Sequence, residues 1–245
     1  MSPRTFLLGA AGATIFIVTS VPASAQLSLG SIYLRGDAGW SDTVNANIHD
    51  RIFALDHIIV GPGGGPGMLD NVGSGWFAGG GVGTQFFEHF RGEIVYTYRG
   101  GYRLDQLDAA TPPTQFRFDL ASNSVMANGY VDFPLRFFGV VPFVGAGVGW
   151  SQTNMSNLSI MNGSSAASAP GGTSNNFGWQ AMAGVGFAVT DGIIVDLFYR
   201  YFDGGHIKTR AGQIVSSGVV VGTYQGAEGS FHAHELGVSI RFPLH

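Results

Sequence analysis

The chain contains no cysteine, a single lysine and few charged residues of either sign. Because it has no cysteine, disulfide bonds, Cys-ligated zinc, thiol catalysis and Cys-held iron–sulfur clusters are excluded. Charged residues make up 11% of the 245 residues, the formal net charge is −4, and Lys208 is the only lysine, a balance that argues against nucleic-acid binding. No apolar run reaches the roughly 20 residues that a membrane-spanning helix needs. The sequence therefore predicts no helical membrane anchor.

The first residues are typical of an exported protein. Arg4 supplies a basic start, residues 6–18 form a short apolar stretch, and Ala23-Ser24-Ala25 is a small-residue cleavage motif. We therefore expect a signal peptide over residues 1–25. No linker divides the remaining residues, so a single domain is expected over 26–245.

Segments in which apolar and polar residues alternate occupy most of the mature chain. This period of two puts successive side chains of a strand on opposite faces. Most segments approach the roughly 9 to 11 residues that a tilted strand needs to cross a bilayer. The sequence predicts an all-β fold, an eight-stranded antiparallel up-and-down transmembrane β-barrel. The predicted strands are residues 30–40, 75–86, 90–98, 121–133, 140–152, 177–189, 193–202 and 230–242.

The connections alternate between short and long, as they do when tight turns lie on one side of a membrane and loops on the other. We expect the turn side to face the periplasm and the long connections to be solvated surface loops. Residues 214–224 are unusually apolar for a loop and are expected to form an extracellular strand extension, with a ten-stranded barrel as the alternative. The expected turns are 88–89, 136–139 and 190–192, and the expected loops are 41–74, 99–120, 153–176 and 203–229.

The aromatic residues sort by type along the outward face of the predicted strands. All tryptophans fall at the loop-side ends and a set of phenylalanines at the turn-side ends, which predicts the two interfacial girdles of a membrane barrel. The predicted girdle residues are Trp40, Trp76, Trp150 and Trp179 on the loop side, and Phe86, Phe133, Phe187 and Phe242 on the turn side.

The inward face carries equal numbers of basic and acidic residues. Buried charges that lack a partner cost several kcal/mol each, so we expect these groups to form ion pairs. An eight-stranded barrel is just wide enough for its side chains to fill, and the prediction is a plugged lumen. The predicted lumen charges are Arg35, Asp37, Arg91, Glu93, Arg99, Asp132, Asp196, Arg200, Glu235 and Arg241.

The end of the chain, His234-Glu235-Leu236-Gly237-Val238-Ser239-Ile240-Arg241-Phe242, resembles the closing strand of the OmpA-like outer-membrane barrels. Over residues 30–242 the chain is similar in particular to the Gly-rich surface-antigen proteins of alphaproteobacteria, also called porin-family proteins. The resemblance implies the outer membrane of a Gram-negative bacterium. It also implies lipopolysaccharide and outer-membrane lipids as partners, and a barrel-assembly machinery that reads the terminal aromatic residue. This chain departs from the pattern by adding Pro243-Leu244-His245.

Two histidines near the last strand are the sharpest candidates for a ligand site. His232 and His234 share one face of a strand and could ligate haem iron or a divalent metal, with His206 as a further ligand. The resemblance implies haem as a possibility, because some family members bind haemin. The competing interpretation is that these rings sit at the headgroup level of the membrane. We expect no cofactor and no metal, with haem as the alternative.

A catalytic site is not expected. Ser230, His232 and Glu235 resemble the Ser/His/Glu set of lipid A deacylases, but strand parity points Glu235 inward and the other two outward. The Gly-rich segments lack the Lys-Ser/Thr that follows a phosphate-binding loop. The leading hypothesis is a non-enzymatic structural and surface-antigen barrel that stabilises the envelope and displays loops for a host or surface ligand. A haem receptor and a lipid A-modifying enzyme remain the alternatives.

Overall fold

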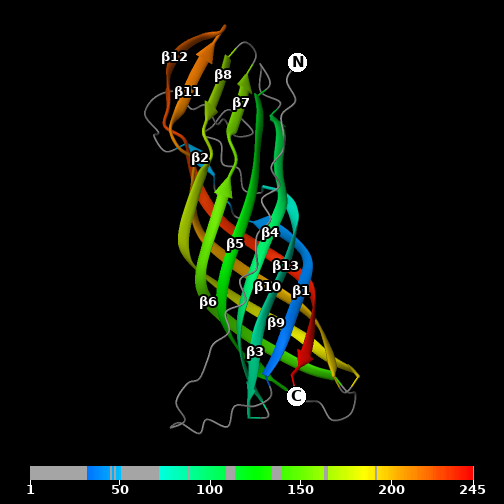
Figure 1. Cartoon of the computed structure of the whole chain (residues 1–245). Helices are drawn as coiled ribbons and strands as arrows, with labels where there is room; N and C mark the ends of the chain where they lie inside the picture. The colour runs from blue at the N-terminus through cyan, green and yellow to red at the C-terminus, as the bar shows by residue number, and fades with distance from the viewer. Residues whose placement is uncertain are drawn as a thin grey trace, which may run out of the picture.

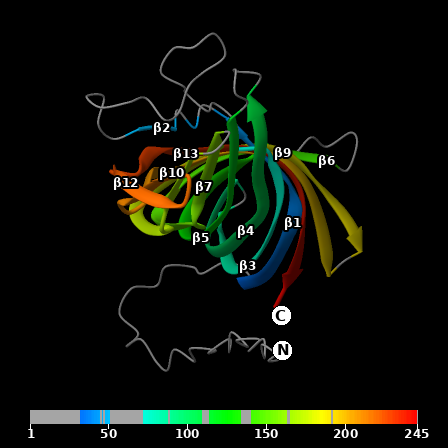
Figure 2. The same ribbon diagram turned by 90° about the horizontal axis from the view of Figure 1, so that it is seen from above.

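The computed structural model describes residues 32–44, 46, 48–50, 72–87, 89–108, 114–133, 140–162, 165–190 and 192–244. The expected signal peptide, residues 1–25, lies outside this set. Eight long antiparallel strands close into a barrel (Figures 1 and 2). In chain order they are β1 (Ile32–Val44), β3 (Ser74–Phe86), β4 (Phe90–Asp108), β5 (Thr114–Asp132), β6 (Val140–Met155), β9 (Gly172–Thr190), β10 (Ile193–Lys208) and β13 (Ala227–Pro243). The predicted fold class is confirmed. In the described part of the chain, no helix is long and apolar enough to span a membrane.

The first and last barrel strands close the wall. β1 pairs with β13 from Tyr33 opposite Pro243 to Val44 opposite His232. The backbone N–H of Leu244 also donates to the carbonyl of Ile32 at 2.7 Å. Residues that follow the terminal aromatic therefore extend the closing ladder. Because the eight barrel strands pair in a continuous ring, the described part of the barrel between its turn and loop ends has no open seam.

One end of the barrel, here called the turn end, carries the short connections. β3 reaches β4 through a turn in which Phe87 has a positive φ, and β9 ends at Thr190 shortly before β10 begins at Ile193. The C-terminus lies at this end (Figure 1). The opposite end is called the loop end.

Several barrel strands run farther toward the loop end than the sequence predicted. β4 and β5 each have 19 residues and continue through much of the segment 99–120, which was predicted as a solvated loop. That prediction was wrong because the alternation of side chains continues there, with polar residues now outward and apolar residues inward. Tyr102 and Leu104 are buried, whereas Arg103 and Asp105 are exposed on the outer face.

Four short strands continue the wall beyond the loop end and are called the head. They are β7 (Leu158–Asn162), β8 (Ser165–Ala169), β11 (Gly212–Ser216) and β12 (Val219–Tyr224). β7 pairs with the end of β5, and the sheet proceeds through β8 and β11 to β12. The short strand β2 (His49–Asp50) pairs with β13. Residues 214–224 thus form the expected strand extension, and the ten-stranded alternative is wrong.

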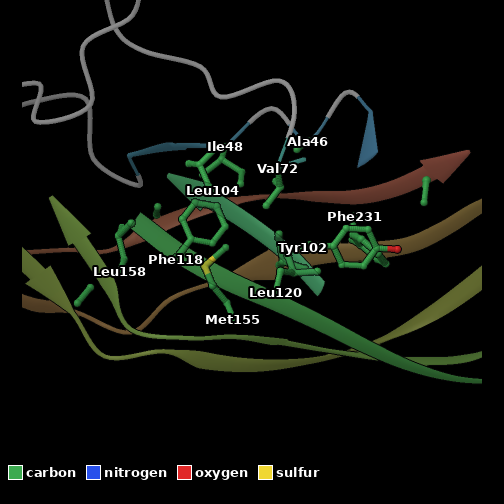
Figure 3. Close-up of a cluster of buried hydrophobic side chains, with 14 of the residues drawn as sticks. Ala46, Ile48, Val72, Tyr102, Leu104, Phe118, Leu120, Met155, Leu158 and Phe231 are labelled. Atoms are coloured by element: carbon green, nitrogen blue, oxygen red, sulfur yellow. The ribbon is translucent and has the colours of Figure 1, made fainter. Parts of the chain in front are cut away.

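An apolar cluster fills the interior at the loop end. Its members come from the barrel strands, the head and the segments beside β2 (Figure 3). Tyr102 and Phe231 meet edge to face with ring centroids 5.5 Å apart. The cluster comprises Ala46, Ile48, Val72, Tyr102, Leu104, Phe118, Leu120, Met126, Met155, Leu158, Ile160, Ala169, Phe202, Ile207, Ala227, Phe231 and Ala233. The wall at this end therefore encloses packed side chains.

Candidate functional site

The inward positions of the barrel strands bring the ten charged groups named in the sequence into one buried interior. Five arginines and five carboxylates are all buried, and each takes part in at least one ion pair. The wall strands β1, β4, β5, β10 and β13 supply them. These residues are Arg35, Asp37, Arg91, Glu93, Arg99, Asp132, Asp196, Arg200, Glu235 and Arg241.

Ion pairs link four of these residues near the turn end. Arg91 Nε lies 2.9 Å from an Asp132 carboxylate oxygen, and Arg91 Nη1 lies 3.3 Å from Glu93 Oε1. The second oxygen of Glu93 accepts a bond from Arg35 Nη1 at 2.6 Å. The hydroxyl of Tyr33 donates to Glu93 at 2.7 Å. Glu93 is therefore held from three sides.

The connections continue toward the loop end through Asp37. One oxygen of Asp37 lies 3.4 Å from Arg35 and 3.6 Å from Arg200. Arg200 Nε also donates to Glu235, whose other oxygen lies 2.7 Å from Arg99 Nε.

Together these contacts form one unbroken series in which the sign of the charge alternates at every step. We call it the charge chain. Its members, in order from the turn end, are Asp132, Arg91, Glu93, Arg35, Asp37, Arg200, Glu235 and Arg99.

The remaining two charged residues form a separate pair. Two nitrogens of Arg241 donate to the two oxygens of Asp196 at 2.8 and 2.7 Å. Ser239 donates to the same carboxylate at 2.9 Å. This bidentate geometry is the strong form of an arginine–carboxylate contact.

Aromatic rings pack against the guanidinium groups of the charge chain. The guanidinium carbon of Arg99 lies 3.6 Å from the centroid of Phe202, and that of Arg200 lies 4.6 Å from the centroid of Phe77. Arg91 lies 4.4 Å from the Tyr130 ring. Such contacts are worth roughly 2 kcal/mol or more when desolvated. They also occupy the volume between the ion pairs.

Sequence reasoning missed the hydroxyl groups that complete this interior. Ser41 donates to Glu235 at 3.0 Å, Tyr102 donates to Ser41, and Arg99 donates to Ser124 at 2.7 Å. Ser124 has the inward parity of a predicted strand, whereas Ser41 and Tyr102 lie in the segments 41–74 and 99–120, which were expected to be loops. These hydroxyl groups carry no charge and so did not stand out.

Two inward glycines leave the space that the charges use. A Cβ atom at Gly79 would overlap the Asp37 carboxylate, and one at Gly83 would overlap the Tyr33 ring. Both lie on β3, which itself contributes no charged residue to the interior. A side chain at either position would displace a member or a neighbour of the charge chain.

The outer wall carries the aromatic residues named in the sequence. Trp40, Trp76, Trp150 and Trp179 are exposed, and Trp40 lies directly opposite Trp76 in the β1–β3 ladder. At the turn end Phe133 and Phe242 are exposed, while Phe86 and Phe187 are half-buried.

The three candidate histidines lie on the outer face of β10 and β13, and each has a protein partner. His206 Nε2 lies 3.5 Å from Glu228, and His232 Nε2 lies 3.5 Å from Asp203. His234 is bonded to the Tyr199 hydroxyl. Within the described residues, no group of three or more His, Asp or Glu side chains is placed to hold a metal.

Ser230, His232 and Glu235 do not form a catalytic set. Glu235 is buried in the interior between Arg99 and Arg200, whereas Ser230 and His232 lie on the outer face of β13. The barrel wall separates the carboxylate from the other two residues. A relay among these three groups is not available in this geometry.

The outer face of β4 and β5 beyond the loop end carries two cross-strand ion pairs. Arg103 lies 2.8 Å from Asp119, and Arg117 lies 2.9 Å from Asp105. Hydrogen bonds from Gln115 and Arg117 lower the pKa of Asp105 below its ordinary value. These pairs are exposed and balanced in charge.

Comparison with known proteins gives a consistent set of matches. A family model described as "Outer membrane protein beta-barrel domain" matches residues 11–242. Outer membrane protein PagN of Salmonella typhimurium is 30% identical over 202 residues, which cover 78% of this chain and 82% of PagN. A Rickettsia rickettsii protein named "Putative adhesin" is 27% identical over 173 residues, covering 67% of this chain and 72% of that protein. Among solved structures, Neisserial surface protein A has a TM-score of 0.48 and 19% identity, covering 87% of this chain and 97% of that one.

Proposed function

The chain belongs to the outer membrane β-barrel family, and from that premise we propose that it is a non-enzymatic structural and surface-contact protein with a plugged lumen. It is a protein of the Gram-negative outer membrane. We infer that the turn end faces the periplasm and that the head lies outside the cell, because short turns are periplasmic in barrels of this class. The barrel then stabilises the envelope, and the head is its contact surface.

The charge chain is the observation that carries the plugged lumen. A solute that passed along the axis would have to separate buried ion pairs such as Arg35–Glu93 at 2.6 Å. Removing one partner from a buried pair costs about 3 to 5 kcal/mol. The apolar cluster at the loop end adds a second layer of packed side chains. Both layers oppose a continuous water path.

Conductance in planar lipid bilayers tests the plug. The refolded protein should give no steady large channels, while a 16-stranded porin inserted in the same bilayer gives them. Steady large openings from the folded monomer would contradict the proposal. A difference in gel mobility between the unboiled and the boiled protein verifies that the barrel is folded in the sample.

The head supports the contact role. Its strands project beyond the loop end, and β11 and β12 lie at the limit of the sheet (Figure 1). The relative from Rickettsia rickettsii that carries an adhesin name is consistent with such a role. We infer a host or surface ligand that binds the head. Cells that express a variant with residues 212–224 replaced by a short Gly-Ser linker should attach less to host cells than cells with the full chain. Equal attachment would contradict the inference.

The same premise gives the outer wall its partners. Exposed tryptophans near the loop end suit contact with lipopolysaccharide headgroups, and outer-membrane lipids cover the apolar wall between the girdles. Phe242 is exposed at the turn end of β13, where the barrel-assembly machinery would read it. Pro243 continues the ladder after it.

The histidine face favours a role at the membrane interface over haem binding. His234 Nδ1 is hydrogen-bonded to the Tyr199 hydroxyl, and the His234 ring stacks on the Tyr199 ring with centroids 5.8 Å apart, which suits an amphipathic ring pair at the headgroup level. His232 stacks on Tyr201 at 6.3 Å. We therefore propose no resident cofactor. Titration with haemin should give no Soret band from binding at these histidines. A Soret band that disappears in the His232→Ala/His234→Ala double variant would contradict the proposal.

A further inference from the structure

The outermost strand of the head has an edge with no partner among the described residues. β12 pairs with β11 on one side and is the terminal strand in the sheet order. β11 and β12 meet at a two-residue turn in which Ser217 and Gly218 both have positive φ. This is the turn geometry that matches the twist of a regular β-hairpin. The hairpin is therefore a formed element that presents one edge to its surroundings.

The exposed edge is apolar and uncharged. Val219, Val220 and Val221 are 63%, 56% and 61% exposed. Residues 211–227 contain no Asp, Glu, Lys or Arg. Natural edge strands are commonly protected by lysine, proline or inward-pointing charges, and an unprotected apolar edge is a site for strand addition. A bulge at Val221 is the one protective feature, and it limits pairing to short segments on either side.

The composition of this edge suits a second copy of itself. A charged strand would place like charges near each other in a symmetric pair, whereas this strand brings together β-branched and uncharged residues. Cross-strand pairs of such residues are favourable by about 0.2 to 1 kcal/mol each. We propose that β12 is a homotypic docking edge, which pairs with β12 of a second copy. The proposal rests on the head lying outside the cell.

The orientation of β12 determines where that second copy must be. Two identical edges pair around a two-fold axis, and an antiparallel ladder requires this axis to be perpendicular to the strands. The β11–β12 hairpin rises away from the turn end along the barrel (Figure 1). The partner is therefore inverted relative to the barrel axis. Two copies in one membrane share one orientation, so the pair forms between copies in two facing membranes.

A single short strand pairing between two copies is weak, so a lasting contact needs many such pairings at once. Many copies on two apposed surfaces convert each further pairing into an effectively intramolecular event. We expect a monomer in dilute detergent solution and tethering of membranes that carry many copies. The edge thus acts between cells that display the same protein.

Vesicle clustering tests the docking edge. The full-length protein is refolded into two populations of phosphatidylcholine vesicles that carry donor and acceptor dyes. Wild-type vesicles should cluster with each other and not with protein-free vesicles. Val220→Lys should reduce clustering to the protein-free level, because it places like charges across the symmetric pair. Val220→Thr, which keeps a β-branched uncharged residue, should retain it.

A second substitution separates edge pairing from general charge effects. Ser168 is exposed on β8, within the head sheet and away from its edge. Ser168→Lys adds the same charge and should leave clustering unchanged. Dispersed wild-type vesicles, equal clustering by Val220→Lys, or clustering with protein-free vesicles would each overturn the proposal. Gel mobility of the same samples reports whether the barrel is folded, and conductance reports whether the lumen is plugged. A failure of the proposed function can therefore be told apart from a failure of β12 pairing.

Discussion

Glu235 is the residue on which the loop-side half of the charge chain depends. It is fully buried, and it accepts bonds from Arg200, Arg99 at 2.7 Å and Ser41 at 3.0 Å. Both guanidinium groups lie in the barrel interior. Their other polar partners are Ser124 for Arg99 and Asp37 for Arg200. Their charge is balanced inside the protein by this carboxylate and by Asp37.

Glu235→Ala should destabilise the barrel by about 3 to 5 kcal/mol, because it leaves buried arginine charge uncompensated. The measurement is urea unfolding of the refolded protein in vesicles, followed by tryptophan fluorescence. Asp119→Ala removes an exposed partner of Arg103 and serves as the control, with little change expected. An equal loss of unfolding free energy in the two variants would show that the buried ion pairs contribute no more to stability than the exposed pair does.

Gly79 tests whether the interior is filled. Gly79→Ala should cost about 1 to 3 kcal/mol, because the added Cβ overlaps the Asp37 carboxylate. Gly36 faces outward on the neighbouring strand β1, and a Cβ there would meet nothing within 4 Å. Gly36→Ala should therefore leave the unfolding midpoint unchanged or raise it. A tolerated Gly79→Ala would indicate free space beside Asp37.

At the scale of the elements, the barrel strands could be predicted where lipid and interior differ most. Alternation near Arg35 and Trp40 identifies β1 because one face is charged or polar and the other apolar. Beyond the loop end the outer face meets water, and Arg103 and Asp105 alternate with buried Tyr102 and Leu104. Side chains still alternate with a period of two, but here the outward residues are polar and the inward residues apolar, as in a soluble sheet. A strand prediction that depends on lipid-facing apolar residues therefore ends β4 and β5 too early.

The short head strands could not be placed from alternation alone. β7 and β8 have five residues each and pair with each other, but the second partner of each, β5 for β7 and β11 for β8, is distant in sequence. β8 pairs with β11, more than forty residues later, through a register that no local pattern specifies. The apolar character of residues 214–224 did indicate a strand extension, because exposed loops seldom need so many β-branched residues.

The outer face of the β4–β5 extension provides a pH test at this scale. Hydrogen bonds from Gln115 and Arg117 favour the ionised form of Asp105, so its pKa lies below the ordinary value. A depressed pKa stabilises the folded hairpin above the unfolded pKa, and this contribution is lost as the pH falls through the lower folded value. Carboxyl carbon NMR should give a titration midpoint for Asp105 below about 3.9. Arg117→Ala should raise that midpoint, and an unchanged midpoint would exclude the contact.

At the scale of the whole molecule, the interior has two layers of different chemistry. The charge chain occupies the part of the barrel that the aromatic girdles enclose, and the apolar cluster occupies the loop end (Figure 3). The arrangement suits its surroundings. Within the bilayer the outer face must be apolar and the interior can hold polar pairs, whereas outside it an apolar core is needed as in a soluble protein.

The layers act together as one closed wall and one filled interior. The ladder from β1 to β13 leaves no backbone edge toward lipid, and the ten charged groups sum to zero net charge from five arginines and five carboxylates. In the proposed function, closure of the ladder stabilises the barrel, and the neutral, paired interior opposes a continuous water path. In the same proposal, the head is the surface that meets the exterior of the cell.

The most direct test of the two-sided barrel wall uses the absence of native cysteine. Single cysteines are placed at Val238 and Ser239, adjacent on β13, of which the first is exposed and the second buried. Reaction rates are measured in vesicles with a membrane-soluble and a water-soluble thiol reagent. A wall with one face in lipid and the other in a filled interior predicts that Val238→Cys reacts with the membrane-soluble reagent and that Ser239→Cys reacts with neither until the barrel unfolds. Fast reaction of Ser239→Cys with the water-soluble reagent, or equal reaction of both variants with the membrane-soluble one, would contradict it.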